Sequence, residues 1–117
     1  MNNSSNSFDI DEQEMNDHLR NQCLKHFGDL THFDTLMKAH DSRLDRSILK
    51  RSQSCCCFYC LKSFPISSVV IPSDPIEDVL CPICGVDSVL GDASGFDIND
   101  THFMEMMKRF WFSPNSN

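Results

Sequence analysis

The segment Cys57–Cys84 reads CFYCLKSFPISSVVIPSDPIEDVLCPIC, and it decides what this chain folds around. It begins and ends with a C-x2-C pair, Cys57/Cys60 and Cys81/Cys84, and twenty residues separate the two pairs. Two such pairs at this separation are the usual framework of a four-thiolate zinc site, because each pair forms a tight turn that brings two sulfurs to one point. We therefore predict one zinc ion bound by these four cysteines.

Four protein ligands fill a tetrahedral coordination sphere, so the pattern favours a structural metal over a catalytic one. A disulfide framework is one alternative, but residues 1–9 contain no Lys, no Arg and no apolar run typical of an export signal. Seven cysteines without such a signal are typical of a reducing compartment, so we expect a cytoplasmic location. No βαβ pattern surrounds either pair, which argues against a thioredoxin-like redox site. Iron in a rubredoxin-like site is the alternative metal.

The register of the first pair is open, because Cys55, Cys56 and Cys57 are consecutive. A Cys56-x3-Cys60 pair is also sterically possible, so Cys55 or Cys56 is an alternative to Cys57 as the ligand. Cys57 is preferred because its spacing to Cys60 mirrors that of the second pair. The other two cysteines are then predicted to be half-buried strand residues, with thiol sensing or metal loading as the alternative roles.

The rest of the chain predicts an α+β fold, in which an antiparallel pair of helices precedes a small zinc-ribbon β region and a C-terminal helix. Asn and Ser dominate the first residues, which predicts a disordered leader. Apolar residues then recur at helical spacing in three runs. The predicted segments are a leader over 1–9, a helical hairpin over 10–53 with helices at 10–27 and 32–51, a zinc ribbon plus C-terminal helix over 54–112, and a disordered tail over 113–117.

Within the ribbon we expect short strands on either side of the two cysteine turns. The predicted positions are 56–58, 76–80 and 87–90 as strands, 64–71 as a strand or a short turn of helix, and 98–112 as the final helix. Asp9, Thr31 and Asp97 are the predicted N-caps, and Gly28 suits the left-handed position after the first helix.

The charge is unevenly distributed. The formal net charge of −7 disfavours general affinity for nucleic acids. Between residues 43 and 62, however, five bases accompany one acid, and a continuous helix would place Arg43, Arg46 and Lys50 on one face. The candidate contacts for a nucleic acid or a partner are Arg43, Arg46, Lys50, Arg51 and Lys62. The other interpretation is a solvated helix face beside a negatively charged metal site.

The final helix is the most apolar of the three predicted helices. Its stripe is expected to cover the helical pair or one face of the ribbon. The alternative is an exposed partner surface, for which the candidate residues are Phe103, Met107, Phe110 and Trp111.

No catalytic motif is present: the chain contains no G-x-S-x-G, no H-E-x-x-H and no phosphate-binding glycine loop. No run approaches the roughly 20 apolar residues of a membrane span. His18, His26, His32 and His40 do not share one helical face, so they predict no second metal site. We therefore expect no enzymatic activity and no association with a membrane.

The two cysteine pairs, the run Cys81–Asp92 (CPICGVDSVLGD) and the closing segment Met106–Phe112 resemble a group of small bacterial cytoplasmic proteins. Those proteins combine a helical N-terminal half with a zinc ribbon and have no agreed activity. The resemblance covers about residues 30–112, and it implies a cytosolic zinc-binding protein without implying a function. The cysteine triplet at 55–57 and the Asn/Ser-rich leader depart from that pattern.

These observations together predict a non-enzymatic protein with one structural zinc ion, which acts as a protein-interaction or regulatory module with an unidentified protein partner. Nucleic-acid binding through the basic residues between Arg43 and Lys62 is the alternative function.

Overall fold

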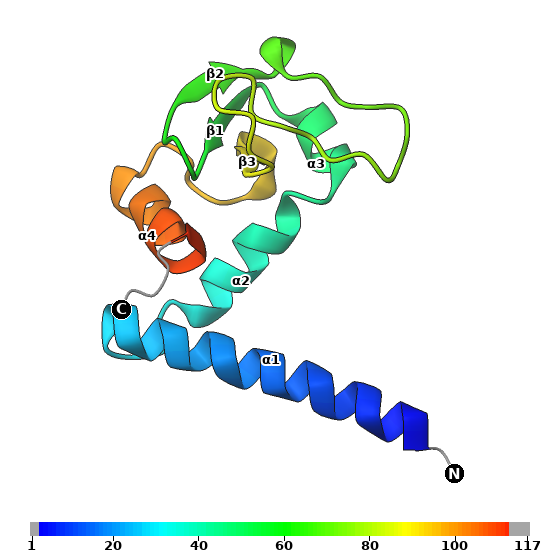
Figure 1. The fold of residues 1–117 in the computed structure, drawn as a ribbon. Coiled ribbons are helices and arrows are strands. Elements are labelled where there is room, and N and C mark those ends of the chain that lie inside the picture. The colour runs from blue at the N-terminus through cyan, green and yellow to red at the C-terminus, as the bar shows by residue number, and fades with distance from the viewer. Residues whose placement is uncertain (1–2, 113–117) are drawn as a thin grey trace. The chain divides into compact units, whose positions relative to one another are not determined.

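The structure is a computed structural model that describes residues 3–112, with side chains described from Glu14 onward. It confirms the predicted α+β class, with helices first, a small antiparallel sheet in the middle and a helix at the end (Figure 1). The elements in order are α1 (Asn3–Phe27), α2 (Phe33–Ser42), α3 (Arg46–Arg51), β1 (Ser54–Cys57), β2 (Ser63–Pro65), η1 (Ile66–Ser68), β3 (Val89–Gly91), η2 (Asp92–Ser94) and α4 (Thr101–Phe112). The predicted tail over 113–117 lies outside the described residues. None of the helices described is long and apolar enough to cross a bilayer.

The chain divides into two compact units, residues 1–34 and 35–117. The first contains α1, which ends at Phe27 as predicted. Gly28 follows with φ 84° and donates its backbone N–H to Leu24 O at 2.8 Å. The helix begins at Asn3 rather than Ile10, so it includes most of the segment that we predicted to be a disordered leader. That segment contains no Pro or Gly to interrupt a helix that is already formed downstream.

The predicted continuous helix over 32–51 is wrong in its middle, because α2 ends at Ser42 and α3 begins at Arg46. Two polar side chains bind the backbone at this break. Ser42 Oγ donates to Ala39 O at 2.7 Å, and Asp45 acts as N-cap of α3 by accepting from Ser47 N at 3.0 Å. Such local bonds compete with helix continuation. Arg43 therefore lies outside both helices and does not share one helical face with the bases of α3.

The sheet has the order β2-β1-β3 and is antiparallel throughout. Cys55 of β1 pairs with Phe64 of β2 and with Gly91 of β3. All three residues of β3 are buried, as are Cys55, Cys56 and Cys57 of β1. The core of the second unit therefore surrounds the strand that leads into the first cysteine pair.

One predicted strand is absent, and the others differ in their bounds: β1 spans Ser54–Cys57 instead of 56–58. Residues 76–80 form no strand, and the predicted segment 64–71 divides into β2 and the 3-10 turn η1. Pro72 and Pro75 lack a backbone N–H and cannot complete a ladder at their positions. The third strand begins at Val89 rather than Asp87. The segment between η1 and β3 is therefore a long loop that carries the second cysteine pair.

The last helix starts at Thr101, later than predicted, because Asp100 is its N-cap. The Asp100 carboxylate accepts the backbone N–H groups of His102 and Phe103 at 3.0 and 3.3 Å. Asp97, the predicted cap, instead accepts from Asn99 N at 3.0 Å in the preceding turn. Three residues of irregular chain thus replace the first turn of the predicted helix.

Candidate metal centre

The four predicted ligands converge. Cys57 closes β1, Cys60 lies in the turn towards β2, and Cys81 and Cys84 lie in the long loop before β3. Their four Sγ atoms all lie within 4.8 Å of one another. The Sγ atoms of Cys57 and Cys84 are 3.6 Å apart, and those of Cys60 and Cys81 are 3.8 Å apart.

These distances fit a metal and not a disulfide. A tetrahedron with Zn–S bonds of about 2.3 Å has S···S edges of about 3.8 Å, whereas a disulfide needs about 2.05 Å. All seven cysteines are free thiols. The sulfurs are therefore spaced as four ligands of a single ion, and the spacing suits zinc and tetrahedral iron equally.

The two cysteine turns have the same backbone hydrogen bonds. Leu61 N donates to Cys57 O at 2.8 Å, and Gly85 N donates to Cys81 O at 2.9 Å. The residue after each second cysteine has a left-handed conformation, with φ 64° at Leu61 and φ 82° at Gly85. The first pair therefore forms the same turn as the second although it has no glycine, and Leu61 takes a conformation that L side chains rarely adopt.

Backbone amides point at the first sulfur of each pair. Cys57 Sγ accepts from Tyr59 N and Cys60 N at 3.3 and 3.4 Å. Cys81 Sγ accepts from Ile83 N and Cys84 N at the same two distances, 3.3 and 3.4 Å. Burial raises the pKa of Cys81, but these amide bonds, together with hydrogen bonds from the Cys84 and Cys60 thiols, bring the pKa below its ordinary value. Both turns thus provide donors that stabilise a thiolate, the form that binds metal.

One further side chain, which the sequence analysis missed, lies beside the sulfur of Cys57. Ser88 Oγ lies 3.0 Å from Cys57 Sγ, and Ser88 is fully buried. The available signal was its place four residues after the second cysteine pair, within the segment 87–90 predicted as a strand.

The two extra cysteines lie outside the quartet, which leaves Cys57 as the member from the triplet. Burial raises the pKa of the Cys55 thiol to about 11 and also raises that of Cys56. Both side chains are buried in β1 rather than half-buried. Their protonated, inaccessible thiols are poorly suited to sensing oxidants.

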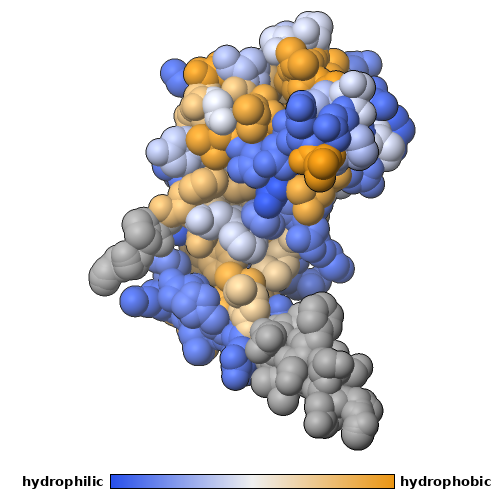
Figure 2. Space-filling model, turned by 45° about the vertical axis from the view of Figure 1, so that its right-hand side comes forward, coloured by the Kyte–Doolittle hydropathy of each residue, from blue (hydrophilic) through white to orange (hydrophobic). Residues whose placement is uncertain are grey.

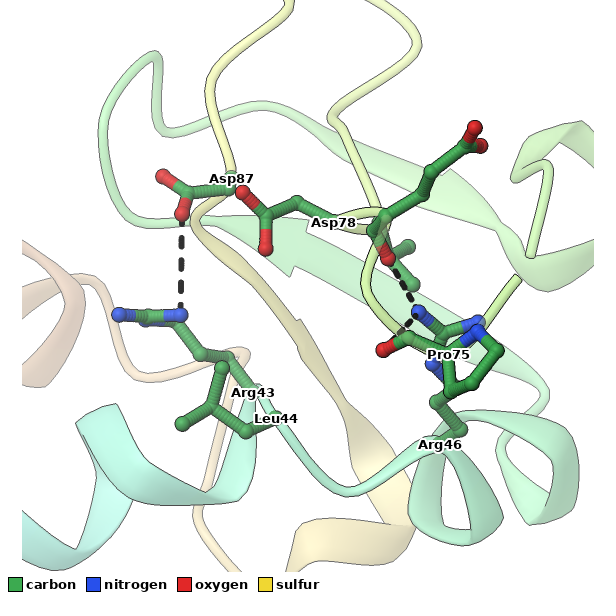
Figure 3. Close-up of a pocket in the computed structure, with 8 residues that line it drawn as sticks. Arg43, Leu44, Arg46, Pro75, Asp78 and Asp87 are labelled. Atoms are coloured by element: carbon green, nitrogen blue, oxygen red, sulfur yellow. Dashed lines mark hydrogen bonds and ion pairs between the residues drawn. The ribbon is translucent and has the colours of Figure 1, made fainter. Parts of the chain in front are cut away.

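The predicted basic residues do not share one surface, and Figure 3 shows two of them, Arg43 and Arg46, directed at other groups of the protein. Arg46 turns towards the long loop and donates to the backbone carbonyls of Pro72, Asp74, Pro75 and Glu77. The Arg46 guanidinium thus donates hydrogen bonds to carbonyl groups that would otherwise be free to pair with a neighbouring strand. These bonds hold the loop against α3.

Arg43 also faces inward. Its Nη1 lies 3.7 Å from the Asp87 carboxylate, and its Nε and Nη2 approach His40 Nε2 at 3.3 and 3.2 Å. Arg51 donates from Nε to Ser47 O at 3.3 Å, while Lys50 and Lys62 are exposed. The five bases therefore do not form one continuous surface for phosphates.

The same region contains a small pocket of about 70 Å³, lined by charges of both signs. Figure 3 shows the Arg43 and Asp87 side chains facing each other at one end of it and Arg46 at the other, with Asp78 between them. Each arginine is already bonded to protein groups, so the pocket contains no free base for an anion.

The apolar stripe along α4 lies largely in the hydrophobic core. Met107 is fully buried and Phe110 is 6% exposed. Trp111 stacks on His40 with ring centroids 3.7 Å apart and donates its Nε1–H to Leu36 O at 3.3 Å. Phe103 stacks on Phe96. The alternative of an exposed partner surface on this helix is therefore incorrect for its central residues, which pack inside the protein.

No protein-family model, curated protein or solved structure matches this chain.

Proposed function

We propose that this chain is a non-enzymatic zinc protein in which one structural ion supports a surface for a protein partner. The observation that carries the proposal is the convergence of four thiol sulfurs at 3.6 and 3.8 Å, with backbone amides directed at two of them. Zinc is favoured over iron because four thiolates in a reducing compartment are the usual ligands of structural zinc. The resemblance to small bacterial zinc-ribbon proteins and a cytoplasmic location belong to the same proposal.

The ion would hold together a part of the chain that has little regular structure. The second cysteine pair lies in a loop without strands, and in this loop only Val79, Cys81 and Ser88 are buried. Metal binding closes the twenty-residue connection between the pairs, and such binding energy contributes directly to folding. With four cysteine ligands the ion has no open position for a substrate or an activated water, which favours a structural role.

The long loop carries the surface that we assign to a partner. Four apolar side chains on it are largely exposed: Val70 at 78%, Ile76 at 85%, Leu80 at 49% and Ile83 at 55%. Asp74, Glu77 and Asp78 lie among them and are also exposed, and residues 70–84 contain no Lys or Arg. Figure 2 shows hydrophobic residues exposed among hydrophilic ones on the face that it views. A partner segment that combines basic and apolar side chains would match this surface.

Metal analysis tests the first half of the proposal. We expect one zinc per chain, and a Co²⁺-substituted protein with the intense near-ultraviolet charge-transfer bands of four thiolates. Cys57→Ser and Cys81→Ser should lower both the metal content and the melting temperature. Cys23→Ser, which changes a cysteine far from the quartet in sequence, is the matched control. Unchanged metal content in both ligand variants would overturn the assignment.

Affinity capture with loop variants tests the second half. Ile76→Glu and Ile83→Glu change exposed side chains, so we expect normal folding and loss of a partner that the wild type retains. Leu24→Glu on α1, where the side chain is 44% exposed, is the control. Retention of the same partner by both loop variants would contradict the assignment of this surface to partner binding. Titration with labelled DNA and RNA at two salt concentrations tests the alternative function, because phosphate contacts produce a steep salt dependence.

A further inference from the structure

Ser88 occupies an unusual position for a hydroxyl group. It is 0% exposed, it lies directly before β3, and its Oγ is 3.0 Å from Cys57 Sγ. The backbone on both sides is also fixed: Ser88 O accepts from Phe58 N at 2.9 Å, and Ser88 N donates to Val86 O at 2.9 Å. The hydroxyl is therefore held against this sulfur by a rigid segment.

The chemistry of the pair sets the direction of the hydrogen bond. A metal-bound cysteine is a thiolate and has no proton to give, so the sulfur accepts and the Ser88 hydroxyl donates. A buried hydroxyl without a partner costs free energy. With a metal bound, the buried Ser88 hydroxyl would have Cys57 Sγ as its acceptor, 3.0 Å away.

This contact makes the two cysteine turns unequal. Cys57 Sγ accepts two backbone amides and the Ser88 hydroxyl, whereas Cys81 Sγ accepts the two corresponding amides. The residue in the first turn that corresponds to Ser88, four positions after the second cysteine, is Phe64. Phe64 has no donor and packs in the same apolar cluster as Cys81. The third donor is therefore present at one turn only.

We propose that Ser88 is a positioning residue of the metal site, whose hydroxyl fixes the Cys57 sulfur and withdraws electron density from it. This inference rests on the proposed metal binding and adds a determinant outside the four ligands. A hydrogen bond to a thiolate stabilises its negative charge and orients its lone pairs, and loss of such a partner typically weakens metal binding 10–100-fold. Cys57 Sγ thus has one more hydrogen-bond partner than Cys81 Sγ, and through β1 it would anchor the ion to the sheet.

The test compares Ser88→Ala with Ser52→Ala in the full chain loaded with Co²⁺ or zinc. Ser52 is the matched control because it is also a buried serine, at 4% exposure, and its Oγ bonds Ile48 O and Ala93 N instead of a sulfur. Both substitutions remove one oxygen atom and keep the Cβ, so both variants should fold. Ser88→Thr restores a hydroxyl and serves as the rescue variant.

We expect Ser88→Ala to keep one metal per chain, to release it to a competing chelator at least tenfold faster, and to shift the sulfur-to-cobalt charge-transfer band to lower energy. Ser52→Ala should lower the melting temperature without moving the band, and Ser88→Thr should return the band towards the wild-type position. An unmoved band in Ser88→Ala, or equal chelator rates in the two alanine variants, would overturn the inference. Failure of the wild type to bind Co²⁺ would instead refute the proposed function.

Discussion

The backbone of Gly91 in β3 packs directly against the side chain of Ser52 at the end of α3. A Cβ added to Gly91 would lie 2.2 Å from Ser52 Oγ and 2.8 Å from Ser52 Cβ. Ser52 Oγ in turn donates to Ile48 O at 2.8 Å and accepts from Ala93 N at 3.0 Å. This contact joins the short helix, the third strand and η2, and it explains why β3 ends in glycine although its φ of −98° suits any residue.

Gly91→Ala should therefore destabilise the protein by about 1–3 kcal/mol, which is the usual cost of overpacking a well-filled site. Thermal or urea unfolding measures the change. Ser52→Gly removes the opposing side chain, so the double variant should lose less than the sum of the two single losses. Additive losses would show that the two residues do not meet.

Gly85 tests the left-handed turn after the second cysteine pair. Its φ is 82° and an added Cβ would meet no atom within 4 Å, so only backbone strain opposes a substitution. We expect Gly85→Val to cost roughly 1–2 kcal/mol and to weaken metal retention, whereas Gly85→Asn should cost clearly less because Asn tolerates this conformation. Equal melting temperatures for the two variants would contradict the assignment.

Removal of the extra thiols tests the ligand register. Cys55→Ala and Cys56→Ala should each retain one metal per chain and the wild-type Co²⁺ spectrum, because neither sulfur belongs to the quartet. Cys57→Ala should lose the tetrathiolate spectrum. A spectrum that changes on loss of Cys56 and survives loss of Cys57 would show that Cys56-x3-Cys60 is the true pair.

Arg46 should act as a clamp on the long loop. Lysine has the same charge but lacks the planar fork that lets the guanidinium serve several carbonyls at once. We expect Arg46→Lys to lower the unfolding free energy by about 1 kcal/mol and to speed proteolytic cleavage within residues 70–80. Arg51→Lys, which changes an exposed arginine of the same helix, is the control. Identical cleavage rates in the two variants would argue against the clamp.

His40 should make stability dependent on pH. Burial lowers its pKa below 6.5, and Arg43 lowers it further, while Asp41 and Asp87 oppose the shift. His40 therefore takes up a proton more readily in the unfolded chain than in the native protein. Above about pH 6.5 the group is neutral in both states and does not change the unfolding free energy. Below about pH 6.5 the unfolding free energy falls as the pH decreases. His40→Gln keeps an acceptor for Arg43 but cannot titrate.

With saturating zinc, the His40→Gln variant should lose less stability than the wild type between pH 7.5 and 5.5. Protonation of the thiolates affects both proteins alike, so the difference between the two unfolding curves isolates the imidazole. Equal losses over this interval would mean that His40 stays neutral or is equally accessible in both states.

The parts of the fold that follow local rules were predictable. The spacing of the two cysteine pairs identified the quartet, because each C-x2-C turn is defined by residues next to one another in the chain. The end of α1 at Phe27 follows from Gly28, and the apolar run near the C-terminus predicted α4 with an error of three residues at its start. The α+β class follows from the change of pattern after residue 53.

The predicted basic surface failed because the positions of its two arginines depend on contacts between residues far apart in the chain. The break between α2 and α3 places Arg43 beside Asp87, and Arg46 reaches the carbonyls of a loop about thirty residues away. Neither partner can be read from the periodicity of the helix that contains the arginine. Two of the five basic residues, Arg43 and Arg46, therefore bond groups of the protein itself, while Lys50, Arg51 and Lys62 remain exposed.

The sequence by itself determined that four thiols would gather in two turns, since spacing and turn chemistry are local properties of the chain. Only the tertiary structure decided that Ser88 Oγ would lie against Cys57 Sγ, that Leu61 would take the glycine-like conformation, and that Arg43 and Arg46 would bond groups of the long loop. The physical reason is that these outcomes depend on which surfaces the folded chain brings together, and burial and hydrogen bonding exist only after that packing has formed.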